Sequence, residues 1–174
     1  MTASSLGRTV RTARLILSPV GWPDLDRMVR LKGDAGAFGL MLGGVRSRKQ
    51  ATEEMADDIA FWARRRVGIF TINENGIFQG MTGLHERPDG LGLGLRFAIW
   101  PHARGRGIAR EAAAAALRFA HDQGEKRVVG VAREENFASR TILGGIGMQV
   151  RGSFLRAGHT MLVYESDRTG MDQG

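Results

Sequence analysis

The chain of 174 residues contains no cysteine, and its four histidines lie far apart in the sequence. Without cysteine it can form neither a disulfide framework nor a thiolate nucleophile. Scattered histidines do not give the ligand spacing of a zinc site. We therefore expect no bound metal and no covalent chemistry based on cysteine.

Long apolar runs are also missing. No segment approaches the roughly 20 apolar residues that a membrane span requires. The first eleven residues are mostly polar and lack the apolar stretch of a secretory signal. We expect a cytoplasmic protein without a membrane-spanning segment.

Aromatic residues make up only 7% of the chain, whereas 25 basic residues outnumber 18 acidic ones and give a net charge of +7. This charge favours anionic partners. The sequence offers no basic stripe with interleaved aromatics, on which single-stranded nucleic acid would stack. We do not expect specific nucleic-acid binding, and nonspecific association with RNA or ribosomes is left as an alternative.

The 43% of hydrophobic residues suffice for one core in a chain of this length. We predict a single α/β domain over residues 1–174, with an ordered core of about 11–165. The hydrophobic pattern and turn signals predict strands at 14–17, 67–72, 77–84, 91–100, 128–132, 150–155 and 160–165 and helices at 22–31, 47–66, 108–123 and 136–146. The glycine-rich stretch 33–46 is expected to be a loop.

Turn signals connect three of these strands. Asn75-Gly76 and Asp89-Gly90 are typical of tight hairpins, so the strands between 67 and 100 should form an antiparallel meander. In residues 91–95 every second residue is glycine, which leaves one strand face without side chains. Such a face marks either the close approach of a ligand or a weakly specified edge.

The most informative segment is 104–109, between the last strand of the meander and an alanine-rich helix. Gly105 and Gly107 lack Cβ atoms and tolerate positive φ, so successive backbone amides can converge on an anion. The following helix points its unpaired amides and positive dipole end at the same place. Arg104 and Arg106 add charge. We predict a phosphate-binding turn, with an ordinary glycine-rich connection as the alternative.

Two familiar phosphate turns do not fit this segment. A dinucleotide-binding fingerprint would need a third glycine where the chain has Arg110. A nucleotide triphosphate loop would need Gly-Lys-Ser or Gly-Lys-Thr, and neither occurs in the chain.

Arg104-x-x-Gly107-x-Ala109 matches the acyl-CoA signature Gln/Arg-x-x-Gly-x-Gly/Ala of the GNAT superfamily of N-acetyltransferases. Over roughly residues 11–165 the chain resembles the ribosomal-protein (RimJ/RimL-like) branch of this superfamily. The segments that carry this resemblance are Arg14-Leu15-Ile16-Leu17, Pro101, Asn136-x-x-Ser139 and Leu143-Gly144-Gly145-Ile146-Gly147-Met148. The resemblance implies a GNAT fold, in which about four helices flank a mixed central sheet of about six to seven strands with a splayed central pair.

The resemblance further implies acetyl-CoA as co-substrate. Its pyrophosphate would lie on the amides of the turn, and its pantetheine arm would enter the gap between the splayed strands, with 128–132 as the opposite wall. The residues so assigned are Phe97, Ala98, Ile99, Arg104, Gly105, Arg106, Gly107, Ile108, Ala109, Asn136 and Ser139. A backbone N–H of the splayed strand would polarise the thioester carbonyl.

The proton donor for the leaving thiolate is less clearly marked. Many family members use a tyrosine in the helix that follows the second parallel strand, but the only tyrosine here, Tyr164, lies in the last predicted strand. Ser139 is the candidate for this role, by hydrogen bonding or by relay through water. Alternatively, Asn136 and Ser139 merely cap the helix.

The general base is also uncertain from sequence. Val131 and Gly94 stand where related enzymes often carry a glutamate. Glu86, at the end of the strand predicted at 77–84, is the candidate base, with a solvated strand-end carboxylate as the alternative. Glu134 and Glu135 lie closer to the turn and could simply face solvent.

Four carboxylates share one side of the helix predicted at 47–66, whose start carries a capping box of Ser47 and Gln50. They are Glu53, Glu54, Asp57 and Asp58, at i, i+1, i+4 and i+5. This side could attract a cationic amine, but we favour a solvated face balanced by Lys49 and the arginines of 64–66.

We therefore predict an N-acetyltransferase that transfers an acetyl group from acetyl-CoA to a primary amine by direct attack in a ternary complex. The acceptor is left open between a protein N-terminus, an amino acid and another small amine, because fold does not settle substrate. A homodimer is left open as well. The alternative is a catalytically silent module that binds acyl-CoA or associates with ribosomes or RNA.

Overall fold

The computed structural model describes residues 7–167, built on one eight-stranded sheet with the order β1-β2-β3-β4-β5-β6-β8-β7. The strands are β1 (Val10–Arg11), β2 (Ile16–Pro19), β3 (Ile69–Glu74), β4 (Ile77–Glu86), β5 (Leu93–Ile99), β6 (Arg127–Arg133), β7 (Gln149–Arg156) and β8 (His159–Asp167). The helices are α2 (Leu25–Lys32), α3 (Ala35–Phe38), α4 (Arg48–Arg65), α5 (Ile108–Asp122) and α6 (Phe137–Gly145), with 3₁₀ turns η1 (Trp22–Asp24) and η2 (Pro101–Ala103).

The predicted α/β class and mixed sheet are confirmed, with eight strands in place of six to seven. The additional strand, β1, has only two residues and is too short to leave a periodic pattern. The chain ends that the prediction left outside the ordered core lie largely outside the described residues. Between residues 7 and 167, no helix is both long enough and apolar enough to cross a membrane.

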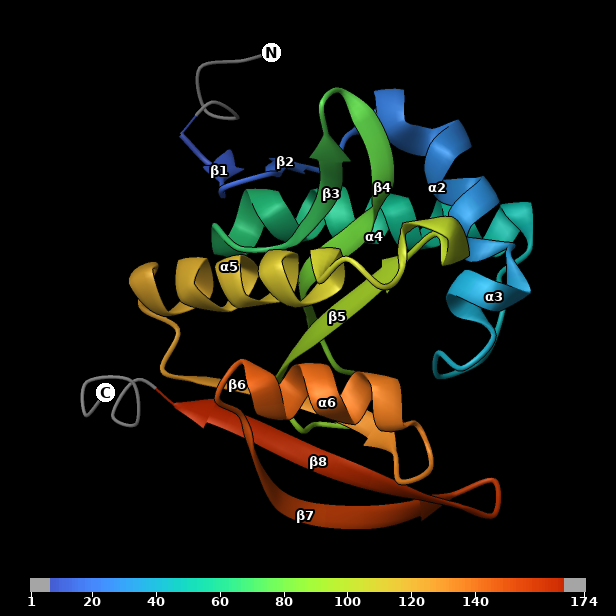
Figure 1. The fold of residues 1–174 in the computed structure, drawn as a ribbon, viewed down its shortest axis with the longest axis vertical. Helices are drawn as coiled ribbons and strands as arrows, with labels where there is room; N and C mark the ends of the chain where they lie inside the picture. The colour runs from blue at the N-terminus through green and yellow to red at the C-terminus, as the bar shows by residue number, and fades with distance from the viewer. Residues whose placement is uncertain (1–6, 168–174) are drawn as a thin grey trace.

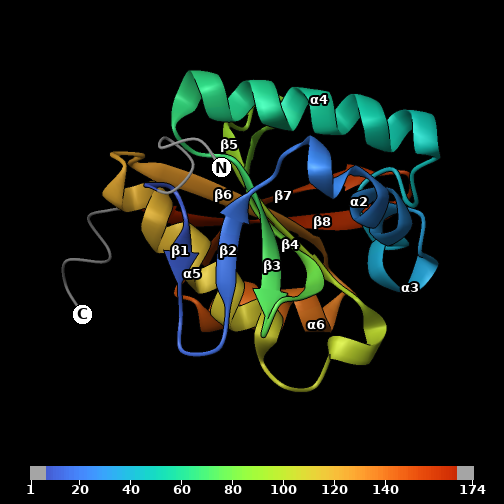
Figure 2. The same ribbon diagram turned by 90° about the horizontal axis from the view of Figure 1, so that it is seen from above.

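Helices cover the two faces of the sheet unequally. Helix α4 lies across one face, and α5 and α6 lie on the other, as the view from above shows (Figure 2). Helices α2 and α3 pack beside the N-terminal part of α4 (Figures 1 and 2). The sheet therefore separates the start of α5 from the side chains that α4 presents.

The one parallel pair in the sheet, β5 and β6, is splayed as predicted. These strands share a single paired position, Gly94 with Val129, whereas the other neighbouring strands are antiparallel and most pair over longer stretches. Beyond Gly94 the side of β5 that faces β6 has no strand partner. The sheet thus opens along residues 95–99 of β5, before the chain enters the turn at 104–109.

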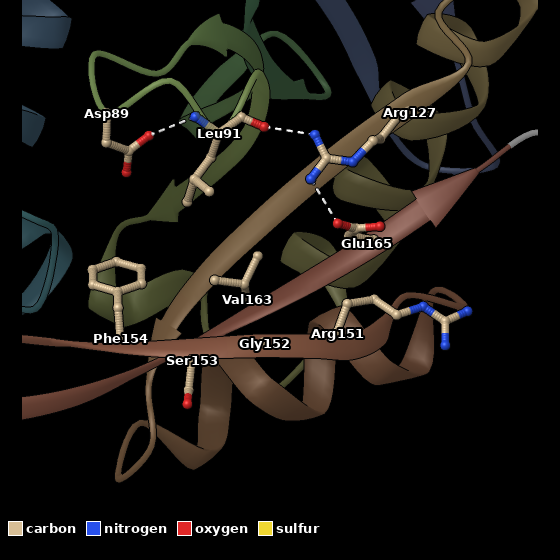
Figure 3. A pocket seen from close by; sticks show the side chains of 9 residues that line it. All are labelled: Asp89, Leu91, Arg127, Arg151, Gly152, Ser153, Phe154, Val163 and Glu165. Carbon is tan, nitrogen blue, oxygen red and sulfur yellow. Dashed lines mark hydrogen bonds and ion pairs between the residues drawn. The ribbon is translucent and has the colours of Figure 1, made fainter.

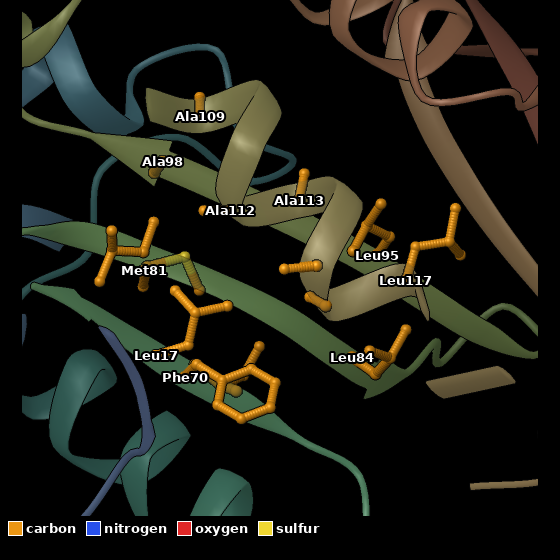
Figure 4. Packing of buried hydrophobic residues seen from close by; sticks show 14 of the residues in the cluster. Leu17, Phe70, Met81, Leu84, Leu95, Ala98, Ala109, Ala112, Ala113 and Leu117 are labelled. Atoms are coloured by element: carbon orange, nitrogen blue, oxygen red, sulfur yellow. The ribbon is translucent and has the colours of Figure 1, made fainter. Parts of the chain in front are cut away.

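Helix α5 lies close to the sheet because its buried face is made mostly of alanine. Ala109, Ala112, Ala113 and Leu117 of α5 belong to the same buried cluster as Leu95 and Ala98 of β5, the strand over which the helix lies (Figure 4). Alanine combines high helix propensity with a small side chain, so the helix axis can approach the strands. This close packing fixes the start of α5 directly beyond the end of β5.

The two expected hairpin turns differ in the structure. Asn75 and Gly76 both have positive φ (52° and 78°), as a tight two-residue turn requires. At Asp89-Gly90 only the glycine has positive φ, and the connection is a longer loop closed by the Arg87 amide on the Gly92 carbonyl (2.9 Å). Asp89 pairs there with the Arg87 guanidinium at 2.6 Å, so it acts as an ion-pair partner as well as a turn residue.

The expected loop at 33–46 contains helix α3. Asp34 caps it by accepting a hydrogen bond from the Ala37 amide at 2.9 Å. The prediction of an entirely irregular segment was therefore wrong. Its glycines and short length conceal a one-turn helix whose sequence signal is only the capping aspartate.

Candidate functional site

The turn at 104–109 has the backbone geometry expected for anion binding. Gly105 and Gly107 have φ of 85° and 77°, and helix α5 starts directly after them. The Arg104 amide donates to the Pro101 carbonyl at 3.2 Å, and the next amide with a backbone acceptor is that of Glu111, which donates to the Gly107 carbonyl at 3.0 Å. The amides of the three preceding residues thus lie at a helix N-terminus without a helical acceptor.

The two glycines are required for their conformation and not for lack of space. A Cβ atom on Gly105 would meet nothing within 4 Å, and one on Gly107 would lie 3.6 Å from Arg14. Positive φ of this size is costly for a residue with a side chain. Substitution would therefore disturb the direction of the amides before it filled the turn.

The arginines of the turn are already engaged with the protein. Arg106 makes a bidentate ion pair with Glu74, at 2.9 and 3.0 Å, and the Arg104 guanidinium donates to the Gly36 carbonyl of α3. Helix α3, absent from the sequence prediction, thus holds one side chain of this turn. An anion bound here would therefore be held by the backbone amides more than by free arginine charge.

Asn136 and Ser139 occupy the start of α6. The Asn136 Oδ1 atom accepts the Ser139 amide at 3.2 Å, so Asn136 caps the helix. Within residues 7–167 the Ser139 hydroxyl makes no hydrogen bond, and the side chain is only half-buried. Tyr164 is buried in β8, and its hydroxyl accepts a hydrogen bond from Arg140 of α6 at 3.3 Å.

Gly94 lies at the paired position where the splay begins, and His85 of β4 lies opposite it. A Cβ atom on Gly94 would lie 3.0 Å from His85 Nε2 and 2.9 Å from Arg87 Cγ. These two side chains fill the space that a glutamate would need. The neighbouring side chains therefore leave no room for a carboxylate at this position.

A cavity of about 210 Å³ lies between α4 and the ends of β4 and β5, on the face opposite α5. It gathers the acidic side of α4 with charged residues of the two strands. Its lining residues are Glu54, Asp57, Asp58, Phe61, Arg64, His85, Glu86 and Arg96. Glu86, the predicted base, is exposed at this cavity, whereas Ser139 belongs to α6 on the other face of the sheet.

The acidic side of α4 is only in part the solvated face that we favoured from the sequence: Glu53 and Asp57 are exposed, whereas Glu54 and Asp58 are not. Glu54 binds Lys32 Nζ at 2.7 Å and Arg46 Nε at 2.5 Å, and Lys32 is fully buried. Asp58 is itself only 9% exposed. The partners come from α2 and from the segment before α4, because helix packing brings them to this side.

Burial shifts the pKa values of the titratable groups around the cavity. It raises the pKa of Asp58 to about 6, against the opposing charges of Lys32 and Arg96. Burial, followed by the charges of Arg96 and Arg87, lowers the pKa of His85 to about 3. His85 is therefore neutral near pH 7, whereas Asp58 titrates close to that range.

Sequence reasoning missed three basic residues of this region: Lys32, Arg46 and Arg96. Arg96 carries the only charge in the otherwise apolar and glycine-containing run 91–100, and that isolation was the available signal. Lys32 and Arg46 left none, since basic residues at helix ends and in loops are usually solvated.

A larger cavity of about 410 Å³ lies between the 89–91 loop and strands β6, β7 and β8 (Figure 3). Three of its charged residues already have protein partners. Arg127 binds the Leu91 carbonyl at 2.7 Å and Glu165 at 2.6 Å, and Asp89 pairs with Arg87. None of the predicted site residues lines this cavity, so size alone does not make it the candidate site.

The remaining acidic candidates lie elsewhere. Glu134 and Glu135 are exposed before α6, and Glu135 Oε1 lies 2.8 Å from His159 Nδ1. Neither lines the cavity next to α4.

Comparison with known proteins places these features in a wider context. A family model described as an acetyltransferase (GNAT) domain matches residues 14–149. No curated protein matches the sequence.

Solved structures match the fold over most of the chain. An acetyltransferase from Agrobacterium tumefaciens C58 is 23% identical, with a TM-score of 0.79 over 92% of this chain and 94% of its own. RimL, a ribosomal L7/L12 alpha-N-protein acetyltransferase in complex with coenzyme A, is 16% identical, with a TM-score of 0.77 over 91% and 97%. Mycobacterium smegmatis RimJ in complex with CoA-disulfide is 20% identical, with a TM-score of 0.75 over 92% and 85%.

Proposed function

Because the chain belongs to the GNAT acetyltransferase family, we propose that it transfers the acetyl group of acetyl-CoA to a primary amine by direct attack within a ternary complex. The observation that carries this proposal is the alignment of three features along one strand. The strand β5 leaves its parallel neighbour after Gly94, and the amide-rich turn at 104–109 and the start of α5 follow.

The donor site fits the residues present. The turn amides would hold the pyrophosphate, and the unpaired side of β5 at Phe97, Ala98 and Ile99 would accept the pantetheine arm. RimL and RimJ, which share this fold, are complexes with CoA or its disulfide, and this supports the assignment. Bound there, acetyl-CoA would supply an activated thioester whose carbonyl a backbone amide of the splayed strand polarises.

The acceptor would enter from the α4 side, where the charged cavity lies. The amine must first lose a proton, then its nitrogen forms a bond to the acyl carbon while the carbon–sulfur bond breaks and the thiolate takes up a proton. Asp58 is a better base than an ordinary aspartate because its raised pKa of about 6 lies nearer to neutral pH. His85, with a pKa of about 3, is too weak a base for this step. Glu86, at the same cavity, can receive the proton through water.

Ser139 is proposed to act near the leaving sulfur. Its hydroxyl has no hydrogen-bond partner in the described part of the chain, and it follows β6, the opposite wall of the gap. A serine donates poorly by pKa, so it would orient a water or relay a proton. Ser139→Ala should then lower turnover more than acetyl-CoA affinity.

The test is release of CoA from acetyl-CoA in the presence of a panel of primary amines, with acetyl-CoA affinity measured separately by calorimetry. We expect turnover with at least one class among free amino acids, small amines and peptide N-termini. The peptide class includes the N-terminus of ribosomal L7/L12, on which RimL acts. Binding of acetyl-CoA without turnover on any acceptor would contradict the proposal and favour a silent acyl-CoA-binding module.

A further inference from the structure

At the cavity beside α4, the charge of the Arg96 guanidinium is felt by Glu54 and Asp58, but neither carboxylate forms an ion pair with it. The Arg96 side chain is mostly buried, yet keeps some contact with solvent at the cavity that it lines. It makes no ion pair or side-chain hydrogen bond in the described part of the chain. Nearby Glu54 does not form an ion pair with Arg96, because its carboxylate is bound to both Lys32 and Arg46. A largely buried guanidinium of this kind is costly unless an anion or polar ligand joins it.

Carboxylates that could still accept hydrogen bonds or ion pairs from a ligand line the same cavity. Asp57 and Glu86 form no ion pair within residues 7–167, and the nearest cation to Asp58 is Lys32 Nζ at 3.9 Å. The cavity therefore presents charged groups of both signs: Asp57, Asp58 and Arg64 on α4, Glu86 at the end of β4 and Arg96 on β5. A ligand that carried only one charge would leave groups of the other sign unmatched.

The size of the cavity limits the ligand. Its volume of about 210 Å³ lies below the roughly 300–1,000 Å³ of pockets that bury drug-sized molecules. Phe61 supplies one apolar wall of the cavity. These dimensions suit a compact molecule with one small side chain.

The position of Arg96 ties this ligand to the reaction. It is the second residue after Gly94, the last point at which β5 and β6 are paired. A carboxylate on Arg96 would hold a neighbouring amine at the mouth of the gap between the strands. That is the place where, under the proposed function, the thioester would be reached from the α4 side.

We propose that the acceptor is a small zwitterion, a free amino acid whose carboxylate binds Arg96 and whose amine is received by Asp58 and Glu86. This inference rests on the proposed acetyl transfer and specifies its acceptor. A peptide N-terminus lacks the adjacent carboxylate, since that group has become an amide. A simple amine lacks it altogether.

The experiment compares each L-amino acid with its own carboxamide, in which only the carboxylate is changed, and with tripeptides that begin with the same residue. Turnover is followed by CoA release. Binding is followed separately by calorimetry in the presence of CoA, where no reaction can occur. We expect at least one amino acid to be preferred over its carboxamide, in kcat/KM and in affinity, by about 10- to 100-fold, the effect of one charge-assisted contact.

Variants of Arg96 test whether this residue is responsible. Arg96→Met should remove the preference for the free carboxylate, and Arg96→Lys should restore part of it, because lysine keeps the charge but not the bidentate geometry. Arg118→Met is the matched control. Arg118 is exposed on α5, on the opposite face of the sheet, and its loss should leave the preference unchanged.

The outcomes separate this inference from the proposed function. Turnover of carboxamides or tripeptides at least as fast as of free amino acids would overturn the zwitterion and leave acetyl transfer standing. Amino-acid binding that depends on Arg96, without any turnover, would support the site and contradict the transfer. Failure of all amino acids to bind would overturn the inference whatever the turnover, and unchanged acetyl-CoA binding and thermal unfolding would show that each variant is folded.

Discussion

At the scale of single residues, burial gives Asp58 and His85 opposite responses to pH. The pKa of Asp58 is raised from 3.8 to about 6, so the folded protein holds this proton more tightly than the unfolded chain. The favourable contribution of Asp58 to the free energy of unfolding is present below pH 4 and is lost as the pH rises through about 6. The pKa of His85 is lowered to about 3, so its contribution is present above pH 6.5 and is lost as the pH falls towards 3.

Two substitutions should separate these effects. Relative to the parent protein, Asp58→Asn should gain stability as the pH rises from 4 to 7, by up to roughly 3 kcal/mol for a shift of about two units. His85→Gln should gain relative stability as the pH falls over the same range. Urea unfolding between pH 4 and 7 measures both, and difference curves with the same slope would contradict the assigned pKa directions.

The turn allows a second prediction at this scale. Gly107→Val places a branched side chain at a φ of 77° and should turn the amides away from their common direction. Acetyl-CoA affinity, measured by calorimetry, should fall by at least about tenfold if one charge-assisted contact is lost. Gly158→Val is the control, because Gly158 has a φ of 79° in the β7–β8 turn and open space around it. Equal affinity in both variants would rule out the pyrophosphate cradle.

At the scale of elements, a buried ion-pair network joins α2, the following segment and α4. Lys32 ends α2, Arg46 precedes α4, and Glu54 on α4 binds both. Burial alone would raise the pKa of Glu54, but these two cations lower it below its usual value. The network thus holds the wall of the candidate acceptor cavity in place.

Removing the acidic member of this network should destabilise the protein more than removing the lysine. Glu54→Gln leaves a fully buried lysine with only Asp58 at 3.9 Å, so we expect a loss of about 2–4 kcal/mol. Lys32→Met leaves Glu54 paired with Arg46 and fills the site with an apolar side chain of similar length, so the loss should be smaller. Chemical denaturation of both variants measures the difference. A smaller loss for Glu54→Gln would mean that Lys32 is adequately neutralised without it.

Element prediction from sequence succeeded where the signal is local. Ser47 and Gln50 do form the expected capping box, with hydrogen bonds of 2.9 and 3.1 Å at the start of α4. The sequence pattern failed at α3, because a one-turn helix is too short to show a period. It also misjudged part of the acidic side of α4, because the partners that bury it lie on other elements.

At the scale of the whole molecule, the splay divides the sheet into two parts. Strands β1 to β5 form one part and β6 to β8 the other, joined at a single paired position. Side chains reinforce this junction. Arg127 of β6 reaches the Leu91 carbonyl at 2.7 Å, and Arg110 of α5 reaches the Gly145 carbonyl of α6 at 3.0 Å.

Weakening this junction should destabilise strands β6 to β8 more than strands β3 and β4. Arg127→Met removes the contacts to Leu91 and Glu165, and we expect a loss of about 1 kcal/mol. Hydrogen exchange should increase in β6 to β8 more than in β3 and β4. Arg156→Met, an exposed substitution on β7, is the control, and uniform exchange across the sheet would argue against a junction at the splay.

The fold class, most helices and strands, and the position of the glycine turn before α5 could be predicted from the sequence alone. These depend on local patterns: periodic apolar residues, a capping box, and glycines placed before an alanine-rich helix. The signature around Gly107 also pointed correctly to the GNAT family. Each of these signals lies within a few consecutive residues, so it can be read without knowing what is packed nearby.

The pairing of the charged residues, in contrast, follows from the tertiary structure. That structure joined Glu54 to Lys32 and Arg46, paired Arg106 with Glu74, and placed Arg96 without an ion pair at the cavity that Asp58 also lines. Pairing and burial of charges depend on contacts between segments far apart in the chain. The proposed donor turn could therefore be located from the sequence, whereas the proposed acceptor site became visible only once α4 was packed against β4 and β5.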